Sequence, residues 1–272
     1  MPAGKLGKWD KAIASGADAI CIDLEDSVPP NQKDSARSEV MSFLNAHEAD
    51  RVKIVLRINS PESDIGMSDI GMLASLKLLP DALMIPKLNG EDPLIKLAHK
   101  LISNGTSLPF IPLIETADAL YNARDILSHD MVKGAVFGGH DLAMQLGCSK
   151  EWDVLSAYRS EFIKSAAGRN LTLIDMPWFG LDNESGLKKE GGNAKRFGFT
   201  AKAAIHPAQV KIINSLFTPS EMEIKEANEI IRVFEESKGH AVAWKGKVLE
   251  PPVINQAKRI VERARNLSRG RY

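Results

Sequence analysis

Seven short runs of apolar residues, rich in isoleucine, valine and leucine, recur along this 272-residue chain, and a stretch of helical character follows each one. Uninterrupted apolar runs of this length are typical of parallel strands that are buried on both faces. Strands that alternate with helices in this way predict an α/β fold. The predicted strands are residues 19–24, 52–58, 82–86, 110–114, 134–138, 171–176 and 201–205.

Two α/β architectures can hold such strands, an open doubly wound sheet and a closed eight-stranded barrel. The open sheet calls for a glycine-rich phosphate turn after its first strand, but the first visible strand here ends in Asp23-Leu24-Glu25-Asp26. A barrel also fits the length, since such barrels run to about 250 residues. We therefore predict a TIM-like (β/α)8 barrel whose first strand is either short, at residues 1–3, or missing.

Residues 218–272 depart from this alternation. Thr218-Pro219-Ser220-Glu221 has the pattern of a helix-capping box with proline at the first helical position. A helix with one apolar face follows, and Pro251-Pro252 then leads into a final amphipathic helix. We expect a barrel domain over residues 1–217 and a C-terminal helical extension over residues 218–272.

Composition excludes several classes of function. The 35 Lys and Arg residues balance 35 Asp and Glu residues, so the chain lacks the basic charge typical of proteins that bind nucleic acid or an anionic membrane. Two cysteines, Cys21 and Cys148, are too few for a disulfide framework, and no apolar run is long enough to span a membrane. Residues 1–5 do not resemble a signal peptide, so we expect a reduced, cytoplasmic protein.

Most of the predicted strands end in a charged or polar residue. In a TIM barrel the active site forms where strands end and loops begin. Glu115 and Asp141 follow consecutive strands, and a strand spacing of about 4.8 Å allows two carboxylates to share one cation. Carboxylates completed by water suit Mg²⁺ or Mn²⁺ better than Zn²⁺. The polar residues at strand ends are Asp23, Glu25, Asp26, Arg57, Asn59, Lys87, Glu115, Asp141, Asp175 and His206.

Two of these residues are cations that permit more than one interpretation. Arg57 ends a buried strand, where its planar guanidinium suits a substrate carboxylate or carbonyl oxygen. It can equally form a buried ion pair with Asp23 or Glu25. Lys87 could form a Schiff base with a carbonyl substrate, although the carboxylate pair favours metal chemistry.

An ordered series of motifs runs along nearly the whole chain. Each motif is weakly specific by itself, but the ordered set resembles the citrate lyase β-subunit family, which is grouped with the HpcH/HpaI aldolases. The motifs are Ala14-Ser15-Gly16-Ala17-Asp18-Ala19, Asp23-Leu24-Glu25-Asp26-Ser27-Val28-Pro29, Lys33 with Ala36-Arg37, Arg57-Ile58-Asn59, Pro86-Lys87, Glu115-Thr116-Ala117, Gly138 with Asp141-Leu142-Ala143, Ile205-His206-Pro207-Ala208-Gln209, Phe217-Thr218-Pro219-Ser220, and Gly246-Lys247 with Pro251.

This resemblance implies a TIM-like barrel that assembles as a homotrimer or hexamer and uses Mg²⁺, with Mn²⁺ as a substitute. It implies cleavage or formation of a carbon–carbon bond in a 3-hydroxy-acyl-CoA thioester such as malyl-CoA, methylmalyl-CoA or citryl-CoA. A small keto acid is the other reactant. By motif match, Glu115 and Asp141 would bind the metal, and Arg57 and Glu115 would bind the substrate. The carboxylates that would orient Arg57 and the waters of the metal are Asp23, Glu25 and Asp26.

The same metal site is compatible with other reactions. A CoA thioester hydrolase and a malate-synthase-like enzyme would use the same residues, and the sequence does not separate them from a lyase. An aldolase for free acids would carry a histidine after an early strand, and Asp23-Leu24-Glu25-Asp26 contains none. The joint presence of Glu115, Asp141 and Arg57 counts against a non-catalytic CoA-binding or protein-binding barrel.

The C-terminal extension supplies one further candidate, Glu250, which stands just before Pro251-Pro252. Related lyases with a lid place an aspartate before a proline-containing helix. By this resemblance Glu250 would act as a catalytic acid or base in the active site of a neighbouring subunit, on a lid that hinges at Gly239. The alternative is a solvated glutamate before a proline turn. The extra methylene of glutamate moves the carboxylate by about one ångström, which can matter for catalysis.

Overall fold

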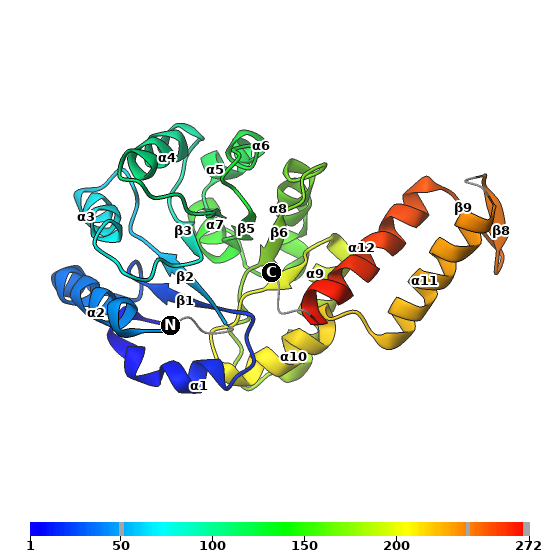
Figure 1. Cartoon of the computed structure of the whole chain (residues 1–272), viewed down its shortest axis with the longest axis horizontal. Coiled ribbons are helices and arrows are strands. Elements are labelled where there is room, and N and C mark those ends of the chain that lie inside the picture. Colours follow the sequence, from blue (N-terminus) through cyan, green and yellow to red (C-terminus); the bar gives the residue numbers. More distant parts are fainter. Residues whose placement is uncertain (49–51, 238–239, 269–272) are drawn as a thin grey trace. The chain divides into compact units, whose positions relative to one another are not determined.

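The computed structural model describes residues 1–48, 52–237 and 240–268. The chain divides into two compact units, Met1–Ile213 and Asn214–Tyr272. The first unit holds a curled, seven-stranded parallel sheet in the order β1-β2-β3-β4-β5-β6-β7 (Figure 1). This arrangement confirms the predicted TIM-like fold and all seven predicted strands. The strands are β1 Ala19–Asp23, β2 Lys53–Arg57, β3 Ala82–Ile85, β4 Phe110–Ile114, β5 Gly134–Phe137, β6 Thr172–Asp175 and β7 Ala201–Lys202.

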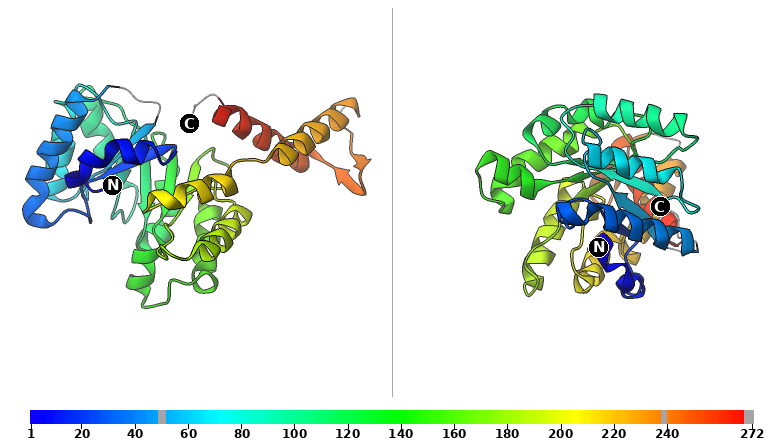
Figure 2. Two further views of the ribbon diagram at one scale, coloured as in Figure 1. Left: turned by 90° about the horizontal axis from the view of Figure 1, so that it is seen from below. Right: turned by 90° about the vertical axis from the view of Figure 1, so that its left-hand side faces the viewer.

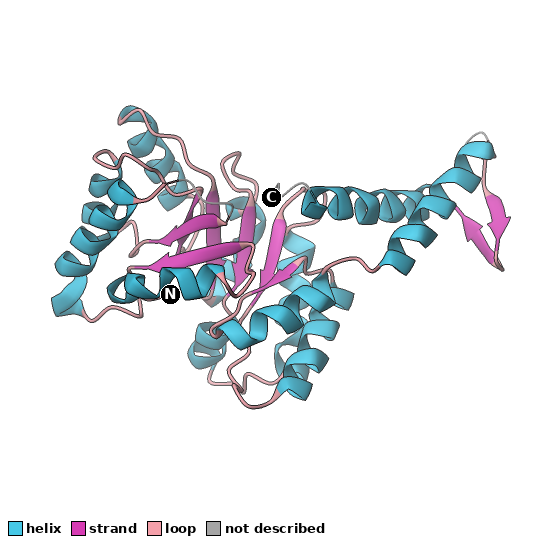
Figure 3. Ribbon diagram, turned by 60° about the horizontal axis from the view of Figure 1, so that its bottom comes forward, coloured by secondary structure: helices cyan, strands magenta, loops and turns pink. Residues whose placement is uncertain are grey.

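The strands owe their uninterrupted apolar runs to burial on both faces. All four residues of β5 are buried, and so are the three central residues of β2. Because the sheet curls around its own core on one side and helices cover the other, apolar residues do not need to alternate with polar ones (Figure 3). The carboxyl ends of the strands are therefore the places where this unit can present polar side chains.

A short segment at the amino end stands in the place of the predicted first strand. Pro2 forms a parallel bridge with Asp23, whose amide donates to the carbonyl of Met1 at 2.9 Å. The amino group of Met1 donates to the backbone carbonyl of Cys21. The side chain of Cys21 is a free thiol, and burial raises the pKa of this thiol to about 11. Within residues 1–3 the described chain thus forms one bridge, at the place where the short-strand alternative predicted the first strand.

Helices follow the strands and cover the outside of the sheet (Figure 2). Among the helices nearest the amino end, Trp9 packs edge-on against the rings of Phe43 and His47. Within the described ranges, no helix is both long and apolar enough to cross a bilayer. The helices of this part of the chain are the 3₁₀ helices η1 Ala3–Lys8 and η2 Pro30–Gln32 and the α-helices α1 Trp9–Ile13, α2 Lys33–Ala46, α3 Asp64–Leu73, α4 Asp92–Ser103, α5 Ala117–Tyr121, α6 Ala123–Ile126, α7 Gly139–Leu146, α8 Trp152–Ser165, α9 Glu184–Phe197 and α10 Pro207–Phe217.

The second unit is built on two helices that lie side by side, with a small hairpin at the end of α11 (Figure 3). Ala227 of α11 packs with Ala257 and Val261 of α12 to form its core. The predicted helical extension is present, and the hairpin is an addition that the sequence did not predict. The elements are α11 Glu221–Glu236, β8 Val242–Trp244, β9 Lys247–Leu249 and α12 Pro251–Ser268.

The capping box of α11 lies two residues further along the chain than predicted. The hydroxyl of Ser220 accepts the amide of Glu223, and the carboxylate of Glu223 accepts the amide of Ser220. The prediction that Thr218 and Glu221 form the box was therefore wrong. The serine and glutamate at 220 and 223 repeat the same spacing, and the helix starts from this second copy of the pattern.

Candidate active site

The carboxyl ends of β1 and β2 bring an arginine and a carboxylate side by side. Asp23 and Arg57 are partners in the parallel register, and Nε and Nη2 of Arg57 donate to the two carboxylate oxygens of Asp23, each at 2.7 Å. Nη1 of Arg57 lies 2.8 Å from Oε2 of Glu25 and 3.5 Å from Oδ2 of Asp26. Burial alone would lower the pKa of Arg57, but the contacts with Asp23 raise it above its ordinary value.

The ion pair with Asp23 and Glu25, one of the two interpretations open from the sequence, is therefore present. It does not use up the guanidinium, which has five N–H donors. Three of these donors are directed at Asp23 and Glu25, and the other two are left by that pair, one of them on the Nη1 that also lies 3.5 Å from Asp26. The carboxylate of Asp23 also accepts the backbone amides of Glu25 at 2.9 Å and Ser27 at 3.3 Å. Asp23 therefore holds both the guanidinium of Arg57 and the loop that follows β1.

A lysine and an asparagine brace this loop from behind. Nζ of Lys33 donates to the carbonyls of Leu24 at 2.8 Å and Glu25 at 2.7 Å and to Oδ1 of Asn59 at 2.7 Å. Nδ2 of Asn59 donates to the carbonyl of Leu24 at 2.9 Å and to Oδ2 of Asp69 at 2.7 Å. No role for Lys33 was predicted, and its only signal in the sequence was its place in the motifs that carry the family resemblance.

Lys87 follows β3 and joins carboxylates from two other strands. Its Nζ lies 2.5 Å from Oε1 of Glu25 and 3.4 Å from Oδ1 of Asp26. Its backbone amide donates to Oε1 of Glu115 at 2.8 Å. Burial would lower the pKa of the Lys87 ammonium, but its contact with Glu25 raises the pKa above the ordinary value. A lysine held protonated in this way is a poor nucleophile, so the geometry opposes the Schiff-base interpretation.

Glu115 and Asp141 stand at the same edge of the sheet. The last residues of β4 and β5, Ile114 and Phe137, are partners in the register, so Glu115 and Gly138 are the next residues on adjacent strands. Asp141 lies in the first turn of α7, where the partial positive charge of the helix end favours a carboxylate. A Cβ placed on Gly138 would lie only 2.3 Å from the Cβ of Glu115, so a glycine is needed for this close approach.

The environment of Glu115 disfavours its negative charge. Burial is the main cause of a pKa that rises to about 7, and the charges of Glu25 and Asp141 act in the same direction. The hydrogen bond from the amide of Lys87 and the charge of Arg57 oppose this rise. A cation beside Glu115 would relieve the repulsion and favour the ionised carboxylate.

Glu115 and Asp141 open into one pocket of about 260 Å³, formed by the loops that follow β1, β3 and β4 and by α7. The sequence predicted this pair as metal ligands. Arg57 does not line the pocket, but its ion-pair partner Asp26 does. The residues that line the pocket are Asp26, Lys87, Glu115, Thr116, Asp141 and Gln145.

The charges at this edge of the sheet fit a divalent cation. Five carboxylates and three cationic side chains gather here, so two negative charges remain uncompensated when all of these groups are ionised. Among the described residues, no group of three or more His, Cys, Asp or Glu side chains is arranged to hold a metal ion. A pair of carboxylates completed by water or substrate is the kind of site that Mg²⁺ occupies. The charged residues are Asp23, Glu25, Asp26, Glu115 and Asp141 against Lys33, Arg57 and Lys87.

Two other strand-end candidates lie outside this site. Asp175 is fully buried and accepts Nε of Arg159 at 2.8 Å and Nζ of Lys202 at 2.6 Å. Lys202 also donates to Glu190 at 2.7 Å, so these residues form a buried ionic cluster between β6, β7, α8 and α9. Nδ1 of His206 accepts the amide of Ala208 at the start of α10. Both residues have local structural roles.

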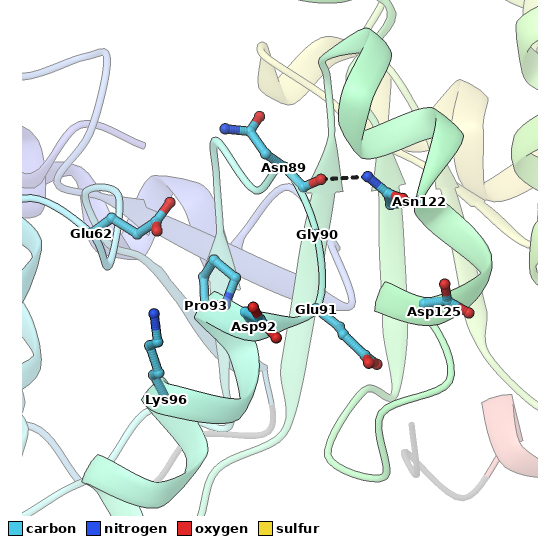
Figure 4. A pocket seen from close by; sticks show the side chains of 9 residues that line it. All are labelled: Glu62, Asn89, Gly90, Glu91, Asp92, Pro93, Lys96, Asn122 and Asp125. Carbon is cyan, nitrogen blue, oxygen red and sulfur yellow. Dashed lines mark hydrogen bonds between the residues drawn. The ribbon is translucent and has the colours of Figure 1, made fainter.

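A second pocket, of about 410 Å³, lies among the loops after β2 and β3 and the short helices after β4 (Figure 4). One wall is held by a hydrogen bond from Nδ2 of Asn122 to the carbonyl of Asn89 at 2.7 Å. Four carboxylates against one ammonium make this pocket strongly acidic, so it is a poor place for phosphate groups. Its charged residues are Glu62, Glu91, Asp92, Lys96 and Asp125.

Glu250 belongs to the Asn214–Tyr272 unit, whereas the other candidate residues belong to Met1–Ile213. Within its own unit Glu250 is exposed, between β9 and α12, and its carbonyl accepts the amides of Val253 at 2.9 Å and Ile254 at 3.2 Å. The predicted hinge at Gly239 lies outside the described residues.

We expect Gly138→Ala to damage the site severely. The added Cβ collides with Glu115, so the β5–α7 turn or Glu115 must move. The overpacking should cost about 1–3 kcal/mol of stability. The displaced carboxylate should lower turnover by roughly 100-fold. Thermal melts and steady-state kinetics check both effects. Gly71→Ala is the control, because a Cβ at Gly71 meets open space. A Gly138→Ala enzyme with ordinary turnover would contradict the close approach.

The chain resembles known proteins in sequence. The model of a protein family described as HpcH/HpaI aldolase/citrate lyase matches residues 7–207. The (3S)-malyl-CoA thioesterase of Cereibacter sphaeroides is 32% identical over 269 residues, which cover 97% of this chain and 92% of that protein. The mitochondrial citramalyl-CoA lyase of Homo sapiens is 29% identical over 98% of this chain and 84% of its own length.

Solved structures agree with this relationship. The protein CitE from Mycobacterium tuberculosis in complex with magnesium, acetoacetate and coenzyme A has a TM-score of 0.80 and 27% identity, over 97% of this chain and 96% of that one. RipC from Yersinia pestis has a TM-score of 0.72 and 34% identity, over 82% of this chain and 95% of that one. Fold, sequence and ordered motifs agree, and this chain belongs to the HpcH/HpaI aldolase/citrate lyase family.

Proposed function

We propose that this chain is a Mg²⁺-dependent lyase that cleaves a carbon–carbon bond in a 3-hydroxy-acyl-CoA thioester such as malyl-CoA, methylmalyl-CoA or citryl-CoA. The observation that carries the proposal is the pair Glu115 and Asp141, which open into one pocket at an edge of the sheet with excess negative charge. A citramalyl-CoA lyase among the relatives and a solved relative that holds magnesium, acetoacetate and coenzyme A support this choice.

In this proposal the charged side chains divide the work. Bound Mg²⁺ would supply Lewis-acid polarisation of the substrate oxygens. Glu115 and Asp141 would hold the cation beside the hydroxy-acid end of the substrate. The two remaining N–H donors of Arg57 bind the oxygen on which negative charge grows in the transition state. Asp23, Glu25 and Asp26 keep the guanidinium in place, so little reorganisation is needed.

Cleavage needs one proton removed and one proton delivered. The substrate hydroxyl loses its proton to a base, the bond to the thioester α-carbon breaks, and the released acyl-CoA enolate takes up a proton. We assign the second proton transfer to Glu250, on a lid formed by residues 218–272. We further propose a homotrimer or hexamer, in which this lid serves a neighbouring subunit.

A hydrolase is the second candidate, and a specific observation favours it: the 32% identical relative is a (3S)-malyl-CoA thioesterase. The same carboxylate pair could direct water to the thioester carbonyl. A malate-synthase-like condensation would use the same residues in the direction of bond formation.

Product analysis separates these reactions. The purified protein is incubated with malyl-CoA, methylmalyl-CoA, citryl-CoA and citramalyl-CoA, with Mg²⁺ or with EDTA. The lyase predicts Mg²⁺-dependent release of a keto acid and a shorter acyl-CoA in equal amounts. Free CoA with no keto acid would identify a hydrolase instead. Turnover that EDTA leaves unchanged would remove the metal from the proposal.

We expect Glu250→Ala to lose the proton transfer at the enolate while it keeps Mg²⁺ binding. Turnover should fall by at least about 100-fold, a typical contribution of a general acid or base. The measurements are steady-state kinetics and calorimetric Mg²⁺ titration. Glu262→Ala, another exposed carboxylate of the same unit, is the control. Full activity in Glu250→Ala would make Glu250 a solvated residue without a catalytic role.

Mixed oligomers test whether the site is shared between subunits. Glu250→Ala subunits retain the metal pair, and Glu115→Gln subunits retain the lid. After verified subunit exchange, some sites should combine an intact pair with an intact lid, and partial activity should return. No recovery would rule out a lid that serves a neighbouring subunit.

A further inference from the structure

Lys87 has a backbone conformation that lysine rarely adopts. Its φ is 55°, in the left-handed region that favours glycine. Among the described residues, the one other non-glycine with positive φ is Lys245, at 45°. Lys245 is explained by its place before Gly246 in the tight turn of the β8–β9 hairpin, since such turns need two left-handed residues. Lys87 lies in no hairpin, so its conformation needs another explanation.

The contacts of Lys87 provide that explanation. With this backbone, the amide donates to Oε1 of Glu115 at 2.8 Å while Nζ lies 2.5 Å from Oε1 of Glu25. The next residue, Leu88, is fully buried, so the chain must also turn inward at once. The left-handed residue satisfies all three requirements together. A residue that cannot hold this φ must rotate the neighbouring peptide bonds, which moves the amide away from Glu115.

We propose that Lys87 is a positioning residue for the metal site, whose backbone amide occupies one carboxylate oxygen of Glu115 and so presents the other oxygen to the cation. This inference rests on the proposed metal pair Glu115 and Asp141. The ammonium of Lys87 has a separate task, because it pairs with Glu25 and neutralises that carboxylate. The side chain thus balances charge, and the backbone sets geometry.

A pair of substitutions separates these two tasks. Lys87→Gly and Lys87→Val both remove the ammonium, but glycine holds a left-handed φ readily and valine does not. The difference between the two variants therefore reports on the backbone alone. We expect Lys87→Val to bind Mg²⁺ roughly 10- to 100-fold more weakly than Lys87→Gly, the usual loss when a group that orients a metal ligand is disturbed. Lys87→Asn, which tolerates this φ, should stay close to Lys87→Gly.

Calorimetric titration of the metal-free full-length protein with Mg²⁺ is the measurement, with thermal melts on the same samples. Lys245→Gly and Lys245→Val form the matched control, because they change φ tolerance in the hairpin turn and should bind Mg²⁺ equally. If Lys87→Val fails to fold, Lys87→Ala takes its place and should bind Mg²⁺ more weakly than Lys87→Gly. Excess Mg²⁺ should restore more turnover in the valine or alanine variant than in Glu115→Gln, which a purely structural role of Lys87 would not produce.

Equal Mg²⁺ affinity in folded Lys87→Gly and Lys87→Val, or in Lys87→Gly and Lys87→Ala, would overturn the inference. Glu115→Gln distinguishes this failure from failure of the proposed function. If Glu115→Gln binds Mg²⁺ like the unaltered protein, the metal pair itself is wrong. If Glu115→Gln loses Mg²⁺ binding but the Lys87 variants do not differ, the metal pair stands and only the role of Lys87 falls.

Discussion

Glu115→Gln and Asp141→Asn should each lose Mg²⁺ binding by at least about 100-fold, with turnover falling below detection and the fold unchanged. Each substitution removes one negative charge from a hard-cation site with two protein ligands and changes the side-chain shape very little. Removal of a charge from Glu115 should even relieve repulsion in the metal-free protein, because burial, Glu25 and Asp141 all disfavour that charge. Calorimetric titration with Mg²⁺, kinetics and thermal melts on the same samples check these outcomes.

Asp118→Asn is the control for this pair. Asp118 is an exposed carboxylate in the first turn of α5, outside the pocket that Glu115 and Asp141 line. It should bind Mg²⁺ and turn over substrate like the unaltered protein. Ordinary Mg²⁺ affinity in Glu115→Gln or Asp141→Asn would remove that residue from the site.

Mg²⁺ affinity should rise with pH between about pH 6 and about pH 8. The pKa of Glu115 is raised to about 7, so at lower pH the carboxyl of the metal-free protein is protonated, and the cation must displace the proton. Above the raised pKa the carboxylate is ionised and the affinity levels off. Titrations in buffers of different ionisation enthalpy measure the released proton. A flat affinity over this range, or the same slope in Glu115→Gln, would contradict this origin of the pH dependence.

Arg57→Lys should lose on the order of 100-fold or more in kcat/KM. A lysine can keep one ion pair with Asp23, but it cannot hold both oxygens of Asp23, contact Glu25 and still present two N–H donors to a substrate. Steady-state kinetics and thermal melts on one preparation measure the loss of activity and the loss of stability separately.

Arg37→Lys is the matched control for the ion-pair contribution. Arg37 is likewise held by two carboxylates, Asp69 at 3.0 Å and Asp34 at 2.6 Å, but neither partner lines the pocket, whereas Asp26, a partner of Arg57, does. Both variants should lose some stability, and only Arg57→Lys should lose activity per folded molecule. If Arg57→Lys melts early but works at the ordinary rate, Arg57 is a structural partner of Asp23 and nothing more.

The strands could be predicted from the sequence because burial on both faces requires a continuous local run of apolar residues. Each strand of a covered parallel sheet is an apolar run, and the seven runs match β1 to β7 within a few residues at each end. The sequence signal for the hairpin of β8 and β9 is weaker. Its strands are three residues each, and the turn signal was the Lys245-Gly246 pair.

The site was predictable only as a set of strand ends. Parallel strands end at one edge, so Glu115 and Asp141 could be expected near each other. The same rule correctly placed Asp175 at a strand end, but it could not indicate that Asp175 is buried by partners that lie far away in sequence. Arg159 and Lys202 are 16 and 27 residues from Asp175, so no local sequence pattern indicates that they pair with it.

Sequence patterns could not predict the backbone contacts to the site. Any residue after β3 has an amide, so nothing in Pro86-Lys87 indicated that this amide would donate to Glu115. The left-handed φ of Lys87 is equally invisible, because the usual signal for that conformation is glycine. The close approach at Gly138 could not be predicted either, because its neighbour, the Cβ of Glu115, emerges only from the register of β4 and β5.

The central claim is that Glu115 and Asp141 hold a divalent cation in the pocket at the carboxyl ends of β4 and β5. Anomalous diffraction from crystals of the protein soaked in Mn²⁺ tests it most directly, because Mn²⁺ accepts the same oxygen ligands as Mg²⁺ and scatters anomalously. We predict one strong peak within about 2.3 Å of a carboxylate oxygen of each residue, and no peak there in Glu115→Gln crystals. A peak elsewhere in the chain, or an empty pocket at saturating Mn²⁺, would contradict the claim.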